Sequence, residues 1–351
     1  MGAVKKALVS GEYEVLMAEN CGMEGERLIG RAQDIPEDAG YYSLVIVKEK
    51  RRDRPLNKEK KVIRLGTRKS PLAMAQARLA AEAIERAFPE LTAELVPIVT
   101  RGDRILDRPL VEFGGKGAFI SEFERALLEG RIDGAVHSAK DMPEELAKGL
   151  VIAAALPRED AGDVLVTVKG RPLPDGPFLV GTGSPRRQVQ IGEMRNARCA
   201  LLRGNIQTRL NKLREGEYDA ILLAAAGLKR MGLLSDPEFS FERLPEKEFI
   251  PAGGQGIIAV ESREHTEFSH VLAAINDPAA FRSLAAERLV LKRLGAGCTG
   301  AVGVYSYSEN GSFHIKLMKG TENGILRREI SGAPEEYEAL AAAVTEGLDH
   351  E

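Results

Sequence analysis

The feature of this chain that most restricts its fold is an internal duplication. An apolar stretch at residues 62–65 runs into the turn GTRKSP, and another at 178–180 runs into GTGSP. Both turns end in serine and proline, Ser70–Pro71 and Ser184–Pro185, which suit the N-cap and first-turn positions of a helix. Each copy is therefore predicted to be a strand, a glycine turn and a helix, the first helix running from residue 71 to about 88.

The duplication continues after these helices. Residues 132–136 and 218–223 are apolar strand candidates, and Asp133 and Asp219 occupy matching places in them. The paired motifs are separated by unequal lengths of chain, which excludes a solenoid of fixed period. The pattern predicts an α/β fold of two related domains with a cleft between them.

The remaining segments differ in character. Residues 48–61 (KEKRRDRPLNKEKK) are typical of a solvated linker, although an exposed helix face would also suit them. A helix at 279–294, the turn GAGCTG, strand-like stretches and a final helix from residue 334 predict a small α+β domain. The glycines of PAGGQG suit a hinge or crossing strand before that domain. The predicted domains are 1–60 (N-terminal extension and linker), 61–157 with 256–276 (first α/β), 158–255 (second α/β) and 277–351 (α+β).

Composition limits the partners that the chain can have. Lys and Arg (49) nearly balance Asp and Glu (52), and only 5% of residues are aromatic, which argues against nucleic-acid or membrane-surface binding. The three cysteines lie far apart, so neither a disulfide framework nor a zinc or other metal site is expected. We see neither a signal peptide nor a segment of membrane-spanning length, and we expect the cytoplasm.

Basic residues gather at predicted turns and element ends. The two helix N-termini after the glycine turns can bind anions, although taken alone they are equally ordinary caps. Arginine pairs bidentately with carboxylates, so several arginines converging on one cleft would suit a ligand with many carboxylates. Each alone would also suit a plain surface position. The residues are Arg68, Lys69, Arg101, Arg104, Lys116, Lys140, Arg186, Arg187, Arg203, Arg209, Lys229 and Arg230.

Two further residues could carry chemistry. Asp141 follows an apolar strand in HSAKDMP, where it could stay ionised beside Lys140 or, if desolvated, give up a proton; a turn or capping aspartate is the alternative. Cys298 lies on a glycine-rich loop, where a thiol can be exposed and carry a covalent group. Cys199 lies among apolar residues and is predicted to be a small buried hydrophobe, and His137 a core or strand-end histidine.

Nine motifs in order resemble the porphobilinogen deaminase (hydroxymethylbilane synthase) family, from about Val62 to the C-terminus. They are VIRLGTRKSPLAMAQA, TRGD, GGKGAFISEFERALLEG, AVHSAKDMP, VGTGSPRRQVQ, LRGNIQTRL, EYDAILLAAAGLKR, PAGGQGIIAVE and GAGCTG. The resemblance implies two domains like those of periplasmic binding proteins and a small α+β domain. Residues 1 to about 60 lie outside it and weakly resemble the C-terminal end of tetrapyrrole methylases.

The resemblance also implies a reaction. Family members are transferases of tetrapyrrole (porphyrin and heme) biosynthesis that join four porphobilinogen molecules into hydroxymethylbilane, releasing ammonia at each step, on a dipyrromethane primer held by a cysteine. Here Cys298 would hold the primer and Asp141 would be the catalytic carboxylate. The primer's carboxylates would bind Lys140, Ser184, Arg186, Arg187 and Arg209. Incoming substrate or the growing chain would face Arg68, Ser70, Gln76, Arg203 and Arg230.

Some positions depart from the family pattern. Pro185 stands where many members carry leucine, Glu112 where some carry lysine, and Thr299 and Gly300 follow the cysteine in place of glutamine and a β-branched residue. They affect local geometry rather than the implied reaction. A monomer that binds porphobilinogen is expected, without nucleic-acid or membrane partners. The alternative is an anionic-solute-binding protein, which would have no use for Cys298.

Overall fold

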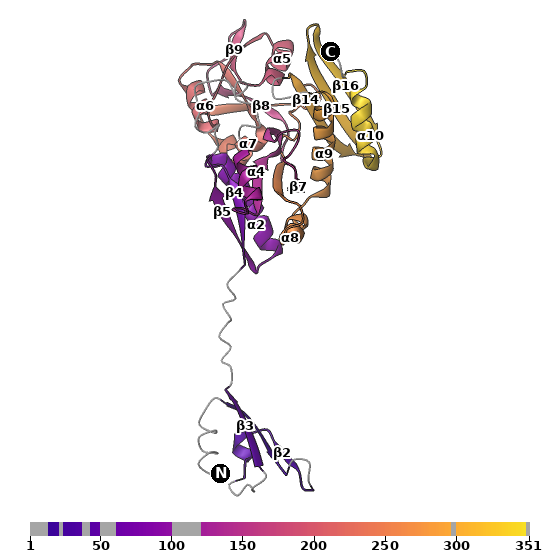
Figure 1. Cartoon of the computed structure of the whole chain (residues 1–351). Coiled ribbons are helices and arrows are strands. Elements are labelled where there is room, and N and C mark those ends of the chain that lie inside the picture. Colours follow the sequence, from indigo (N-terminus) through magenta and orange to yellow (C-terminus); the bar gives the residue numbers. More distant parts are fainter. Residues whose placement is uncertain are drawn as a thin grey trace. The chain divides into compact units, whose positions relative to one another are not determined.

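The computed structural model describes residues 13–20, 24–36, 43–49, 61–99, 121–295 and 300–348. The chain divides into two compact units, Met1–Lys60 and Lys61–Glu351. Figure 1 shows the sheets and helices of each.

The N-terminal unit contains a small antiparallel sheet with strand order β2-β1-β3. Its elements are β1 (Tyr13–Glu19), β2 (Arg27–Ile29), the 3-10 turn η1 (Ala32–Asp34) and β3 (Ser43–Glu49). Val15, Met17 and Ile35 form its buried core. The predicted linker, 48–61, was wrong at both ends. Residues 48 and 49 continue β3 through main-chain pairing with β1, and residue 61 begins the next strand; side-chain polarity does not reveal such pairing.

The first α/β domain is built on a five-stranded sheet with order β5-β4-β6-β13-β7. β4 pairs in parallel with β5 and β6, whereas β13 lies antiparallel between β6 and β7. Its core contains Ile63 and Leu65 of β4 and Ile84 of α2. The strands are β4 (Lys61–Thr67), β5 (Leu91–Pro97), β6 (Gly134–Ser138), β7 (Leu150–Ala155) and β13 (Ile258–Arg263), and the helices are α2 (Pro71–Ala87), α4 (Ser121–Leu128) and α8 (Ser269–Ala274).

The second α/β domain has a five-stranded sheet with order β10-β9-β11-β8-β12. β9 lies in parallel between β10 and β11, and β8 lies antiparallel between β11 and β12. Cys199 is half-buried against this sheet's core, less buried than predicted. The strands are β8 (Asp163–Val168), β9 (Phe178–Gly181), β10 (Ala197–Ala200), β11 (Ala220–Ala224) and β12 (Phe239–Leu244), and the helices are α5 (Pro185–Met194), α6 (Ile206–Arg214), α7 (Ala225–Arg230) and η5 (Leu233–Ser235).

The duplicated residues make equivalent contacts within each of the two domains. Asp133 accepts a hydrogen bond from Arg64 N (2.8 Å), and Asp219 accepts one from Leu179 N (2.7 Å), each on the strand before the glycine turn. The glycines of these turns also correspond. A Cβ on Gly66 would lie 2.5 Å from a side-chain carbon of the residue before Asp133, and one on Gly181 would lie 2.8 Å from the residue before Asp219. The predicted duplication is confirmed, and close packing explains why each copy has a glycine two residues after the main-chain donor.

The C-terminal domain packs two helices on one three-stranded antiparallel sheet, order β14-β15-β16. Its elements are α9 (Pro278–Arg293), β14 (Val302–Glu309), β15 (Ser312–Thr321), β16 (Gly324–Gly332), η6 (Pro334–Glu336) and α10 (Tyr337–Thr345). Val290 of α9, Ile315 of β15 and Val344 of α10 lie in its core. The fold is therefore α/β, with two related domains that each contain a five-stranded mixed sheet, followed by a small α+β domain. Within the described residues, no helix combines the length and apolar composition that a membrane crossing needs.

Candidate functional site

Lys140 and Asp141 lie in a short 3-10 turn, η4 (Ala139–Asp141), directly after strand β6. Ala139 N donates to Ile257 O (3.0 Å), which ties the turn to the segment leading into β13. Gly254, with φ +74°, approaches the same main chain so closely that a Cβ would lie 3.0 Å from Ala139 C. Asp141 is exposed and Lys140 is half-buried. The main chain of the turn is thus held by the segment before β13, while the carboxylate of Asp141 is exposed to solvent.

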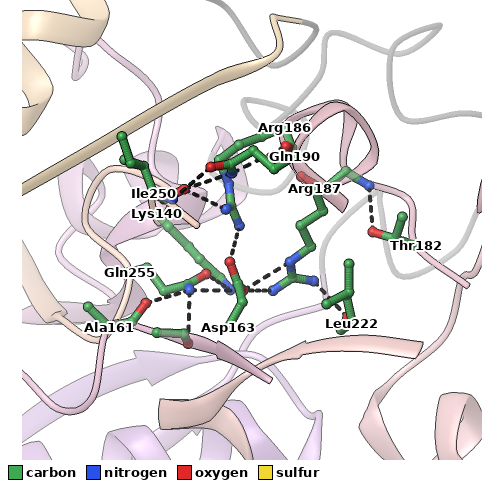
Figure 2. Close-up of polar contacts among 12 residues, drawn as sticks. Lys140, Ala161, Asp163, Thr182, Arg186, Arg187, Gln190, Leu222, Ile250 and Gln255 are labelled. Atoms are coloured by element: carbon green, nitrogen blue, oxygen red, sulfur yellow. Dashed lines mark hydrogen bonds and ion pairs between the residues drawn. The ribbon is translucent and has the colours of Figure 1, made fainter. Parts of the chain in front are cut away.

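A buried carboxylate holds two arginines in the second domain. Arg186 and Arg187 begin helix α5, and Asp163 begins strand β8. The Nη2 of Arg186 lies 2.7 Å from Oδ2 of Asp163, and Arg187 reaches Oδ1 through Nη2 (2.6 Å) and Nε (3.0 Å), as Figure 2 shows. Burial alone would raise the pKa of Asp163, but the adjacent arginines and Lys140 hold it well below its ordinary range. Asp163 therefore stays ionised.

Main-chain carbonyls fix the other ends of the same guanidinium groups. Arg186 Nη1 donates to Ile250 O (2.7 Å), and Arg187 Nη1 donates to Leu222 O (2.9 Å). The side chains of Arg186 and Arg187 are only 4% and 8% exposed. Both are therefore held in one place before any ligand arrives. Ser184 precedes them as the N-cap residue, but its side chain makes no capping bond; its N–H instead donates to Thr182 Oγ1 (3.2 Å).

Lys140 joins this group through Gln255. Lys140 Nζ donates to Gln255 Oε1 (3.2 Å), and Gln255 Nε2 donates to Asp163 Oδ1 (3.1 Å). Burial and the positive charge of Arg187 lower the pKa of Lys140 to about 8, against the opposing charges of Asp141 and Asp163. The ammonium thus lies among charges from both α/β domains.

Arg209, in the first turns of α6, belongs to the same electrostatic neighbourhood. Its Nε donates to Gly204 O (2.7 Å). Burial, Arg187 and Arg203 lower the pKa of Arg209 to about 10, while the charge of Asp141 opposes them. We name Lys140, Arg186, Arg187 and Arg209 the cation cluster. It brings together four of the predicted primer-binding residues beside Asp141.

The residues predicted to face substrate are more dispersed. Ser70 caps helix α2, where its Oγ accepts from Ala73 N (3.3 Å). Gln76 is buried and its amide donates to Ser138 Oγ (2.7 Å), at the end of β6. Arg230 donates to Gly256 O (2.6 Å), and Arg68 and Arg203 are half-buried. Their proposed roles stay predictions.

Some predicted residues lie outside the described part of the chain, namely Cys298, Arg101, Arg104 and Lys116. His137 is confirmed as a buried strand residue, with Nε2 2.9 Å from Glu261 Oε2. Within the described ranges, no group of three or more His, Cys, Asp or Glu residues is placed to hold a metal ion.

Asp163 and Gln255 are site residues that sequence reasoning missed. Asp163 opens the strongly apolar stretch DVLVTV, and a carboxylate at the start of a buried strand requires a cationic partner. That requirement was a usable signal. Gln255 lies among the glycines of PAGGQG, and these glycines indicate a hinge or crossing strand but say nothing about the side-chain amide.

Comparisons with known proteins give one match to a family model. The model described as porphobilinogen deaminase, dipyromethane cofactor binding domain, matches residues 63–270, more than half of the chain.

Solved structures are similar at low identity. The BenM effector-binding domain with benzoate is 16% identical, with 64% of this chain and 95% of that chain covered and a TM-score of 0.39. An arginine-specific periplasmic binding protein of Salmonella typhimurium is 11% identical (64% and 98% covered, TM-score 0.36). One for arginine transport from Legionella pneumophila is 16% identical (65% and 99%, TM-score 0.36). At these TM-scores the similarities carry no argument about function.

Proposed function

This chain belongs to the porphobilinogen deaminase family, and we propose that it joins four porphobilinogen molecules into the linear tetrapyrrole hydroxymethylbilane, releasing ammonia at each step. One observation carries the proposal: in the described part of the chain, cations from both α/β domains gather beside Asp141 and exceed the carboxylates among them. The cation cluster holds four positive charges, and of the described carboxylates Asp163 and Asp141 interact with it. Such an excess suits a ligand that brings its own negative charges.

The cation cluster fits the dipyrromethane primer that the family description names. Each of its rings carries an acetate and a propionate, and planar guanidinium groups pair with such carboxylates. Asp163 already holds Arg186 and Arg187 in position, so little side-chain freedom is lost on binding. Lys140 and Arg209 would complete the site, and Cys298 would be the point of attachment. When bound, the primer supplies the nucleophilic pyrrole carbon to which the first substrate is joined.

Asp141 would act on the substrate. In each step the carbon–nitrogen bond of the aminomethyl group breaks and a carbon–carbon bond forms, and the nucleophilic pyrrole carbon loses the proton that balances the departing ammonia. After the fourth addition, water cleaves the bond between the primer and the first added ring; its hydroxyl group goes to the released chain and its proton to the primer. The exposed carboxylate of Asp141 would help to protonate the leaving amine and stabilise the positive pyrrole nitrogen that develops. Lys140 at the neighbouring position and Arg209 from the second α/β domain would orient the carboxylates of the rings.

The test is turnover of porphobilinogen by the natural chain and by Asp141→Asn. We expect the natural chain to release ammonia and form hydroxymethylbilane. Asp141→Asn should lose about a hundredfold to ten-thousandfold in kcat, the usual contribution of general acid–base catalysis. Its thermal midpoint should hardly change because Asp141 is exposed. Binding of porphobilinogen without ammonia release would instead support the anionic-solute-binding alternative and contradict the proposal.

A further inference from the structure

Two chain segments cross between the α/β domains beside the cation cluster. They are residues 156–162, between β7 and β8, and 245–257, between β12 and β13. Glu159 N donates to Gly256 O (3.1 Å), which holds the two segments side by side. Gln255 lies in the second segment and only 1% of its surface is exposed. Its side chain therefore has a fixed environment made by both segments.

The two ends of the Gln255 amide face opposite charges, as Figure 2 shows. Oε1 accepts from Lys140 Nζ (3.2 Å), while Nε2 donates to Asp163 Oδ1 (3.1 Å) and Ala161 O (2.7 Å). A carboxylate and a carbonyl accept but cannot donate, so the amino end of the amide must face them. An amide can serve both neighbours at once. A carboxylate in its place would repel Asp163, and an alkyl group would bond to neither.

The main chain around Gln255 is joined to the C-terminal domain. Gln255 O accepts from Arg158 Nε (2.9 Å), and Gly254 N donates to Glu287 Oε2 (2.6 Å). Glu287 lies on α9, is fully buried, and also accepts from Arg158 Nη1 (2.6 Å). Gln255 therefore follows a residue that bonds to the C-terminal domain, and its own side chain bonds to Lys140 of the cation cluster.

We infer that Gln255 is a positioning residue for the reaction, and that its amide sets where Lys140 lies relative to Asp163. This inference rests on the proposed function. Gln255 acts through its two partners rather than on the substrate. Its Oε1 also favours the charged form of Lys140. Among the described residues, Asp141, Asp163, Arg186 and Arg187 are the charged groups that shift the pKa of Lys140. The amide thus controls both the place and the charge of one ammonium group in the primer site.

The test compares the full-length natural chain with Gln255→Leu, Gln255→Glu and the matched control Gln190→Leu. Gln190 is an equally buried amide that bonds to the main chain of Ile250 through Nε2 (3.0 Å) and Oε1 (2.7 Å). None of its hydrogen bonds in the described part of the chain reaches Lys140 or Asp163. The measurements are kcat and KM for porphobilinogen, the thermal midpoint, and the pH midpoint for loading primer-free protein with porphobilinogen.

Gln255→Leu is expected to lose about a hundredfold in kcat, the scale of a small misplacement near a reacting centre, while Gln190→Leu stays within about threefold. The loading midpoint should move to lower pH in Gln255→Leu, because the ammonium loses an acceptor. It should move to higher pH in Gln255→Glu, because a carboxylate favours the charged form.

Equal losses of kcat in Gln255→Leu and Gln190→Leu would show a merely structural role and overturn the inference. If Gln255→Leu does not fold, Gln255→Glu decides, and an unchanged loading midpoint in that variant overturns it. A natural chain that neither loads nor turns over porphobilinogen would remove the proposed function, and the inference with it. A natural chain that works normally beside a Gln255→Glu variant with natural kcat and midpoint would remove the inference alone.

Discussion

At the scale of single residues, the site depends on the negative charge of Asp163. It bonds to Arg186 and Arg187 directly and to Lys140 through Gln255. Without it, three cations would lie close together in a buried region, where their mutual repulsion is weakly screened. The carboxylate therefore stabilises the arrangement that we propose for carboxylate binding.

Asp163→Asn should accordingly destabilise the protein. Removing one member of a buried ion pair costs about 3–5 kcal/mol, whereas the half-exposed pair of Asp160 with Arg243 contributes about 1 kcal/mol or less. Urea unfolding of Asp163→Asn and the control Asp160→Asn measures both. Because the pKa of Asp163 is depressed in the folded chain, its contribution is present above the ordinary aspartate value of about 4 and is lost as pH falls below it. Equal losses in the two variants at neutral pH would contradict this account.

Lys140 gives the site a pH dependence. Its pKa is lowered to about 8, so in primer-free protein the ammonium loses its proton as pH rises through that value. Loading with porphobilinogen should therefore weaken above about pH 8. A Lys140→Arg variant, charged throughout this range, should show no such decline. Loading measured from pH 6 to 10 by intact mass tests this, and a natural profile that matches the arginine variant would refute it.

At the scale of elements, the close approach of the two crossing segments requires a residue without a side chain. Gly256 has φ +88°, and a Cβ there would lie 2.3 Å from Glu159 O. Gly216 has nearly the same φ, +84°, but a Cβ there would meet nothing nearer than 3.7 Å. The pair separates the effect of backbone conformation from that of steric overlap.

Gly216→Ala should cost about 1 kcal/mol because of its positive φ alone. Gly256→Ala should cost about 1–3 kcal/mol more, because the methyl group overlaps a main-chain carbonyl that cannot rotate away. Denaturant midpoints of the two variants measure the difference. If both variants lose the same stability, the crossing segments are not packed as described.

Much of the fold and part of the site could be predicted from the sequence. The glycine turns, the caps Ser70 and Ser184 and the paired aspartates are local signals, and they located strands and helices within a few residues. The convergence of the basic turns followed from the strand-end rule for α/β folds. The ion pairs of Asp163 with Arg186 and Arg187 could not be predicted from the sequence. They depend on how the start of β8 is placed relative to the start of α5, which no local pattern reveals. The start of the linker was misplaced for a related reason, since pairing with β1 extends β3 into charged residues.

At the scale of the whole Lys61–Glu351 unit, the C-terminal domain contacts both crossing segments and Arg186. Glu287 bonds to Arg158 and to Gly254 N, and Val304 N of β14 donates to Pro251 O (3.0 Å). A Cβ on Gly303 would lie 3.1 Å from Arg186 Cδ. In the chain, Cys298 falls between α9 and β14, the two elements that make these contacts. This arrangement supports the proposal that a primer attached at Cys298 is held by Arg186 and its neighbours.

The most direct test of the proposed function is the intact mass of the purified full-length chain, compared with Cys298→Ala. The account predicts that the natural chain, loaded with porphobilinogen, carries a covalent excess equal to two pyrrole units. It also predicts further additions of single units during turnover, and no excess in Cys298→Ala. A natural chain that keeps its unmodified mass after incubation with porphobilinogen would contradict the account.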